Sequence, residues 1–262
     1  MFDFLFLKQG RDFILDLIFP IECLACGREG KWLCPECFPR LKFKPSQYCL
    51  ACKKENDFGG LCRSCRPLYF FDGVFIAGDY DNKTVAEMVK KLKYNLAKDL
   101  ADDLGKFLAL FVRNLISGSL NFSTQFIELP GRGNRLNGLP SVLRNLEKNL
   151  IIPIPLHPRR ERWRGFNQAE LLARRFAEYF NLEISTDYLK RIKHKKPQAK
   201  LNEAARSENI KDCFAFKGEN LAGRNILLVD DIITTGHTLS EAARVLKENG
   251  AGQVWGLVVA KG

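Results

Sequence analysis

Two adjacent carboxylates stand beside a run of small hydroxyl residues near the end of the chain. Asp230 and Asp231 follow four apolar residues, 226–229. The turn after them contains Thr234, Thr235, Gly236, His237 and Thr238. The start of a helix offers unpaired backbone N–H groups and the positive end of its dipole, so such a turn can bind a phosphate. Carboxylates can accept hydrogen bonds from a diol or help to hold a divalent cation. The pattern therefore predicts a sugar-phosphate site.

The elements on either side of this turn are expected to position it. The apolar run 226–229 predicts a strand buried on both faces of a parallel sheet. Residues 239–249 have a helical pattern, for which Thr238 and Glu241 predict a capping box and Gly250 the C′ position. The alternative is an ordinary strand, turn and helix with a solvated acidic pair. It does not explain why two threonines and a glycine follow the aspartates.

Eight of the nine cysteines form four pairs with a spacing of two intervening residues. The pairs are Cys23 and Cys26, Cys34 and Cys37, Cys49 and Cys52, and Cys62 and Cys65. Zinc takes four thiolates in a tetrahedron and each pair supplies two, so we expect two structural zinc sites with every ligand position filled. Neighbouring pairs are expected to combine in sequence, with a crossed arrangement as the alternative. A disulfide framework or a redox pair is less compatible with the lack of a secretion signal.

Basic residues gather in two places in the second half of the chain. Arg159, Arg160, Arg162 and Arg164 follow the loop of Pro155, Leu156 and His157, and the second cluster contains Arg191, Lys193, Lys195, Lys196 and Lys200. Guanidinium forks match the oxygens of a pyrophosphate group. A loop after a strand end is also where an open α/β sheet places ligand contacts. The alternatives are solvated charge or a nucleic-acid surface that contacts phosphates.

The composition of the 262-residue chain indicates an anionic partner. Its formal net charge of +11 suits a phosphorylated small molecule, a nucleic acid or an acidic membrane surface. Residues 1–20 are apolar but interrupted by charges, which predicts an amphipathic helix that docks on the protein, with weak membrane-surface contact as the alternative. No apolar run is long enough to span a membrane and no signal-type cleavage site follows, so a cytoplasmic location is expected.

The order of elements predicts a doubly wound α/β fold after a small metal-binding module. Residues 21–67 form the zinc module, and 68–262 the α/β domain. Strands are expected at 71–80, 188–191, 226–229 and 253–260, and helices at 84–93, 96–115 and 168–179, the last with a capping box of Asn167 and Glu170. Pro153 and Pro155 disfavour a central strand at 151–156, so these residues are predicted to be a strand end that turns into a loop. Residues 114–150 are an excursion, with a short helix at 142–150.

The strand, acidic pair and threonine loop resemble the PRPP-binding motif of type I phosphoribosyltransferases. Most of the chain resembles the ComF family of phosphoribosyltransferase-like proteins, which is associated with DNA uptake in competent bacteria. The matching features are the cysteine pairs, KLKYN at 91–95, PIPLH and RRERWRGFNQAELLA within 153–173, Gln198, Leu201, Arg206, Asn209, and VDDIITTGHTL at 229–239. The fold implied is a type I phosphoribosyltransferase-like, doubly wound parallel sheet with an N-terminal double zinc ribbon. Residues 114–150 are longer than the family pattern.

The resemblance also implies roles for individual residues. Asp230 and Asp231 would be the catalytic pair that holds the ribose hydroxyls of PRPP, and residues 234–238 would hold its 5′-phosphate. Pro155, Leu156 and His157 would form the pyrophosphate loop near Arg160 and Arg164. Residues 191–206, with Arg191 and Lys196, would form a flap. The activity implied is Mg²⁺-dependent phosphoribosyl transfer to an unnamed acceptor with release of pyrophosphate.

Two other functions compete with this hypothesis. The first is a nucleic-acid-handling factor that uses the site for DNA ends or nucleotides, with single-stranded DNA or DNA-uptake proteins as partners. The second is a module that senses PRPP without turning it over. The sequence leaves the acceptor and the choice between monomer and homo-oligomer open.

Overall fold

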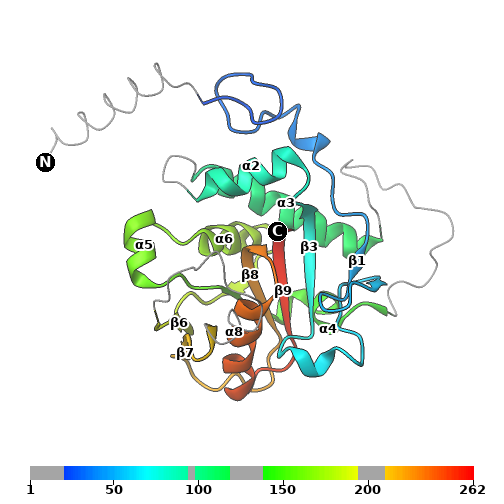
Figure 1. Ribbon diagram of the computed structural model, residues 1–262, viewed down its shortest axis with the longest axis vertical. Coiled ribbons are helices and arrows are strands. Elements are labelled where there is room, and N and C mark those ends of the chain that lie inside the picture. The colour runs from blue at the N-terminus through cyan, green and yellow to red at the C-terminus, as the bar shows by residue number, and fades with distance from the viewer. Residues whose placement is uncertain (1–20, 94–97, 119–137, 194–209) are drawn as a thin grey trace, which may run out of the picture.

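The computed structural model describes residues 21–93, 98–118, 138–193 and 210–262 (Figure 1). The helix expected at 1–20 lies outside these residues, as do much of the excursion at 114–150 and most of the flap, including Lys195, Lys196 and Lys200. Those expectations stay predictions. In the described ranges, no helix is both long and apolar enough to cross a membrane.

Five parallel strands form the central sheet, and their carboxyl ends lie at one edge. In spatial order they are β3 (Gly73–Asp79), β9 (Val254–Lys261), β8 (Ile226–Ile233), β4 (Leu150–Pro153) and β5 (Glu183–Ile184). The central position of β8 explains its run of apolar residues, because side chains on both of its faces are covered. The acidic pair therefore sits in the middle of the edge where ligands of open α/β sheets bind.

Helices cover both faces of the sheet, which confirms the doubly wound fold (Figure 1). The helices α2 (Lys83–Leu92), α3 (Leu100–Ser117) and α6 (Gln168–Phe180) pack on one face, and α8 (His237–Glu248) packs on the other. Leu227 and Val229 of β8 point into the first layer, whereas Ile226 and Leu228 point into the second. This alternation follows from the two-residue period of a strand.

Smaller elements flank this core. They are α4 (Ser141–Arg144), the 3₁₀ helix η5 (Leu146–Lys148), α5 (Pro158–Arg164), and the antiparallel pair β6 (Leu189–Arg191) and β7 (Phe214–Phe216). The helix expected at 142–150 is therefore two short turns followed by β4. The described helix α3 begins at Leu100, after the start expected at residue 96.

Strand β4 is an interior strand, which corrects the interpretation drawn from its prolines. It pairs with β8 as far as Pro153, and Ile154 N–H still donates to Val229 O at 2.9 Å. On the other side β5 pairs only with Leu150 and Ile151. The nitrogen of Pro153 faces this second side, past the end of β5, so no ladder hydrogen bond is lost.

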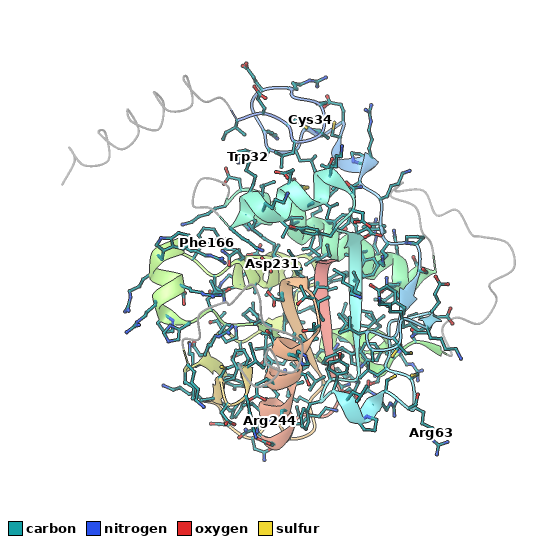
Figure 2. The ribbon with its side chains drawn as sticks, in the orientation of Figure 1. Trp32, Cys34, Arg63, Phe166, Asp231 and Arg244 are labelled. Carbon is teal, nitrogen blue, oxygen red and sulfur yellow. The ribbon has the colours of Figure 1, made fainter. Side chains whose placement is uncertain are left out.

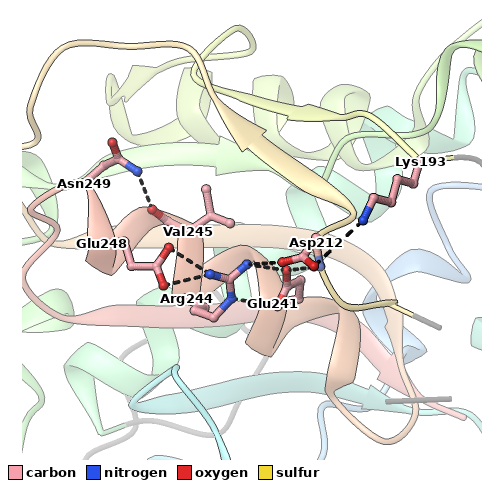
Figure 3. Close-up of polar contacts among 7 residues, drawn as sticks. All are labelled: Lys193, Asp212, Glu241, Arg244, Val245, Glu248 and Asn249. Carbon is pink, nitrogen blue, oxygen red and sulfur yellow. Dashed lines mark hydrogen bonds and ion pairs between the residues drawn. The ribbon is translucent and has the colours of Figure 1, made fainter. Parts of the chain in front are cut away.

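The capping box predicted from Thr238 and Glu241 is wrong. Gly236 is the N-cap of α8, and Glu241 instead accepts a hydrogen bond from Asp212 N at 2.7 Å and forms an ion pair with Arg244 (Figure 3). Arg244 also binds Glu248 and Asp212, so one guanidinium ties α8 to the segment before β7. The C-terminal prediction is confirmed, because Gly250 has a φ of +86° directly after the C-cap.

The cap predicted for α6 is half right. Asn167 is the N-cap, and its side chain accepts a hydrogen bond from Ala169 N at 3.1 Å. Glu170 does not complete a capping box, because its carboxylate binds Arg174 one turn further along the helix at 2.7 Å.

The zinc module divides its contacts between the two faces of the sheet. It contains the 3₁₀ helices η1 (Phe38–Arg40) and η2 (Arg66–Leu68) and the short pair β1 (Gln47–Tyr48) and β2 (Glu55–Asn56). Cys23, Cys34 and Cys37 belong to the apolar layer that contains α2 and α3. Cys49 and Cys65 belong to the layer that contains α8.

Gly105 allows α3 and α6 to approach closely, because a Cβ at this position would collide with Cβ of Arg175. We expect Gly105→Ala to lower the free energy of unfolding by about 1–3 kcal/mol, the usual cost of overpacking. This clash should outweigh the helix propensity gained, about 1 kcal/mol. Chemical denaturation measures the change, and an unchanged or raised stability would show that the two helices can separate at little cost.

Candidate functional site

Strand β8 extends beyond the apolar run, so both aspartates lie within the strand rather than after it. Asp230 Oδ1 accepts a hydrogen bond from Asp231 N at 2.8 Å, and Asp231 Oδ1 accepts one from Ile232 N at 2.7 Å. Both carboxylates bend back toward the main chain, and the two groups interact with each other. The strand end thus holds two acidic groups side by side (Asp231 is labelled in Figure 2).

Asp230 shares one small pocket with the threonine turn. The pocket is also lined by Thr234, Thr235, Gly236, His237 and Thr238. Gly236 has a φ of +83°, which suits glycine, and α8 begins at the next residue. The first amides of this helix have no partner inside the helix and are available to an anion. We call residues 234–238, which are predicted to bind a phosphate, the cradle. One of the two predicted carboxylates, that of Asp230, lines the same pocket as the cradle.

The pKa of the Asp230 carboxyl is raised well above 3.8. Burial is the main cause and the neighbouring charge of Asp231 the second, while Lys93 acts in the opposite direction. The ammonium of Lys93 lies 3.7 Å from Asp231 Oδ2. Lys93 follows the end of α2 and belongs to the KLKYN motif, for which the sequence analysis predicted no role. Its contact with the acidic pair makes it part of the site.

Three arginines converge beside the acidic pair. Arg160 comes from α5, Arg164 from its last turn and Arg191 from β6. Burial and the positive charges of Arg191 and Arg164 lower the pKa of Arg160, and burial also lowers the pKa of Arg191, which Asp230 and Cys213 partly offset. Because like charges repel one another and lose hydration on burial, this cluster is best balanced by a bound anion.

The loop expected to bind pyrophosphate connects β4 to this cluster. Pro155 is buried, and Leu156 and His157 are half-buried. His157 is the N-cap of α5, and its Nδ1 accepts a hydrogen bond from Arg159 N at 3.2 Å. One ring nitrogen therefore orders the start of α5, the helix that carries Arg160 and Arg164.

Two buried donors near the cluster have no partner among the described residues. Arg164 Nη1 donates to Gln168 Oε1 at 3.0 Å, but Arg164 Nε and Gln168 Nε2 are buried without a hydrogen bond. In the same part of the structure His237 Nε2, at the cradle, is also unsatisfied. Buried polar atoms without partners are costly, so donors of this kind fit a ligand rich in acceptor oxygens. A phosphorylated sugar has that chemistry.

Each cysteine tetrad can hold one zinc ion. In Cys23, Cys26, Cys34 and Cys37, and in Cys49, Cys52, Cys62 and Cys65, all sulfur atoms lie within 4.8 Å of one another. The Cys26–Cys34 and Cys52–Cys62 sulfur pairs are 3.7 Å apart. Tetrahedral zinc with Zn–S bonds of about 2.3 Å requires about 3.8 Å. The Ser64 hydroxyl and the Cys65 thiol lower the pKa of Cys62 to about 6, which favours the thiolate that a metal binds. Sequential pairing is confirmed.

The outcome for the predicted site is uneven along the chain. Asp230 lines the same pocket as the threonine turn, whereas Asp231, the next residue of β8, does not line it. Arg191 lies close to Arg160 and Arg164, and Lys196 lies outside the described residues. The ninth cysteine, Cys213, is a buried thiol. Sequence reasoning missed Lys93 and Gln168. Each lies within a motif that the sequence analysis quoted without giving the residue a role, Lys93 in KLKYN and Gln168 in RRERWRGFNQAELLA.

Comparisons with known proteins match two separate parts of the chain. A phosphoribosyl transferase domain matches residues 164–261, and a double zinc ribbon domain matches residues 14–66. Competence protein F of Haemophilus influenzae is 29% identical over 253 residues, 91% of this chain and 97% of that protein. DNA utilization protein YhgH of Escherichia coli K12 is 27% identical over 89% of this chain and 86% of its own length. Competence protein ComFC of Bacillus subtilis is 41% identical over 101 residues, 38% of this chain and 39% of its own.

The raised pKa of Asp230 has a consequence for stability. The carboxyl of Asp230 has a higher pKa in the folded than in the unfolded protein. The free energy of unfolding therefore falls as the pH rises above 3.8, and the fall is complete once the pH exceeds the raised pKa. Asn cannot ionise. We therefore expect Asp230→Asn to be more stable than the wild type near neutral pH, by about 0.5–2 kcal/mol as is typical for functional groups.

Thermal unfolding at several pH values, without metal or sugar phosphate, measures this difference, which should shrink as the pH falls toward 3.8. Asp187→Asn is the control, because Asp187 is exposed and Lys190 lowers the pKa of its carboxyl. A gain in the control, or none in Asp230→Asn, would contradict the electrostatic interpretation.

Proposed function

The chain belongs to the ComF family, and from this premise we propose that it binds Mg²⁺-PRPP at the end of β8 and transfers the phosphoribosyl group to an acceptor. The observation that carries the proposal is the single pocket that joins Asp230 to the start of α8. A helix start suits a phosphate, and a carboxylate suits hydroxyl groups. PRPP presents both groups on one ribose.

The remaining groups of PRPP would fall on the charged residues around this pocket. Asp230 and Asp231 would accept hydrogen bonds from the ribose hydroxyls, with Lys93 balancing their charge. The pyrophosphate would lie by the loop after β4, where Arg160, Arg164 and Arg191 supply donors. Mg²⁺ would be held by substrate oxygens and by these carboxylates, and it supplies further positive charge. The unpaired donors of Arg164 and Gln168 support an acceptor-rich group here.

The chemistry of the transfer needs positioning and charge. The bond between C1′ of the ribose and the pyrophosphate oxygen breaks, and the acceptor forms a new bond to C1′. Negative charge grows on the leaving pyrophosphate, and the three guanidinium groups would stabilise it there. The carboxylates would hold the ribose through its hydroxyls while positive charge develops near C1′. Orientation and electrostatics then provide most of the rate enhancement.

A second candidate function is single-stranded nucleic-acid binding, and one observation favours it. Trp163 of α5 is 73% exposed, and its neighbours Arg159 and Arg162 are exposed as well. An exposed aromatic ring can stack on bases while basic side chains contact phosphates. The names of the relatives mention competence and DNA utilization. In this function DNA or DNA-uptake proteins would be the partners, and the cytoplasm stays the proposed location.

Calorimetric titration with Mg²⁺-PRPP tests the main proposal. We expect binding at one site, weakened roughly 10- to 150-fold by Asp231→Asn, because hydrogen bonds to a charged group contribute about 1.5–3 kcal/mol. Asp187→Asn is again the control, since this exposed carboxyl is paired with Lys190. An unchanged affinity in Asp231→Asn, or a wild type that does not bind PRPP, would contradict the proposal.

Two further measurements separate the competing functions. Pyrophosphate release on addition of nucleobases or nucleic acids distinguishes a transferase from a PRPP sensor. Salt-dependent binding of single-stranded DNA that Trp163→Ala weakens and Asp231→Asn does not would establish the nucleic-acid function.

A further inference from the structure

Residues that flank the second cysteine tetrad in the chain contact the phosphate cradle. Leu50 lies between the metal ligands Cys49 and Cys52, and a Cβ on Gly236 would come within 2.6 Å of Leu50 Cδ2. The hydroxyl of Tyr69 donates a hydrogen bond to Thr235 O at 2.9 Å. The cradle is thus contacted by Leu50 of the zinc module and by Tyr69, which directly follows η2 at the end of the module.

A short, ordered connection leads from the metal ligands to this contact. Cys65 is the N-cap of η2, and Tyr69 is the C-cap of the same helix. The next residue, Phe70, donates its N–H to Ser240 Oγ in the first turn of α8 at 3.1 Å. The ring of Tyr69 lies 4.8 Å from that of Phe71 and 6.4 Å from that of His237. Side-chain packing and two hydrogen bonds therefore hold the loop and the start of α8 against the segment that directly follows the second tetrad.

The hydrogen bond to Thr235 also bears on the orientation of the cradle. The peptide between Thr235 and Gly236 is planar and trans, because the structure has no cis peptide bond among the described residues. When Tyr69 holds the carbonyl on its side, the N–H of Gly236 points the opposite way. The tyrosine therefore helps to set the direction of an amide that lines the pocket.

The first tetrad lies elsewhere and makes different contacts. Its residues pack with α2 and α3, where Lys91 lies 5.2 Å from the ring centre of Trp32 and Lys106 lies 4.9 Å from that of Phe38. Figure 2 places Cys34 of the first tetrad far from Arg63, which stands between two ligands of the second. The two metal sites can therefore have separate effects.

We propose that the second zinc site positions the 5′-phosphate cradle, so that its metal occupancy sets the affinity for a sugar phosphate, whereas the first site has no such effect. The inference rests on the proposed function, because it concerns the same cradle. Tyr69 and Leu50 are positioning residues. A cysteine tetrad that has lost its metal also loses its geometry, and Tyr69 and Leu50 would move with it.

The exposed ligands of the two tetrads offer a matched pair of variants. Cys26→Ser and Cys52→Ser should each lose one zinc ion, as measured by elemental analysis. We expect Cys52→Ser to weaken ribose 5-phosphate binding by about 5-fold or more, in the usual range of coupling between sites. Pyrophosphate binding should persist in both variants because its arginines lie on α5 and β6. Equal effects of the two substitutions on ribose 5-phosphate would overturn the inference.

Tyr69→Phe tests the same link without disturbing the metal. It removes the hydrogen bond to Thr235 and keeps the ring, so ribose 5-phosphate affinity should fall roughly 2- to 12-fold, as for one neutral hydrogen bond. Pyrophosphate affinity should not change, although a general loss of structure would lower both. Tyr179→Phe is the control, since its hydroxyl accepts a bond from Arg113 on another face.

Amide hydrogen exchange of residues 234–239 provides a readout that needs no ligand. Exchange should quicken in Cys52→Ser and stay at the wild-type rate in Cys26→Ser. If the wild type binds neither PRPP nor ribose 5-phosphate while exchange responds in this way, the proposed function fails and the positioning role stands. If exchange and binding are the same in Cys52→Ser as in the wild type, the positioning role fails alone.

Discussion

The site depends on an electrostatic imbalance that the fold holds in place. Burial and Asp231 raise the pKa of Asp230, while burial and neighbouring arginines lower the pKa of Arg160. Neither group is in its preferred surroundings. Asp230 is held by the central strand β8 and Arg160 by helix α5, which follows the loop after β4. A ligand with hydroxyl groups at one end and phosphate charge at the other relieves both costs at once. The stability lost by the empty site is then recovered on binding.

The sheet alone does not complete this arrangement. The cradle also packs against residues in and directly after the zinc module, which precedes every strand of the sheet in the chain. Each metal tetrad joins a different apolar layer, one with α2 and α3 and the other with α8. A module too small for a core of its own thereby becomes part of the core on both faces. Tyr69 and Thr235 are 166 positions apart in the chain, and they meet where the layer that contains Cys49 and Cys65 packs against α8.

Local patterns in the sequence predicted what local interactions decide. The spacing of the cysteines gave the correct pairing, and the run 226–229 with its acidic pair correctly predicted the strand and the turn after it. Glu241 failed as a capping residue because Arg244 and Asp212 compete for its carboxylate, and Asp212 lies 29 positions away. Pro153 is harmless only because β5 ends early. Tyr69 acts through the tertiary fold, which no spacing in the sequence reveals.

The geometry of α5 also bears on the two candidate functions. Arg160 and Arg164 are one helical turn apart and share the side of the helix near Arg191. On this side Arg164 Nε and Gln168 Nε2 are buried without a hydrogen-bond partner among the described residues. Arg159, Arg162 and Trp163 are exposed on the remaining surface. A polymer lying on the outside would reach the second group, whereas a small phosphorylated ligand in the pocket would reach the first. The two candidate functions would therefore use different side chains of one helix, so neither proposal excludes the other.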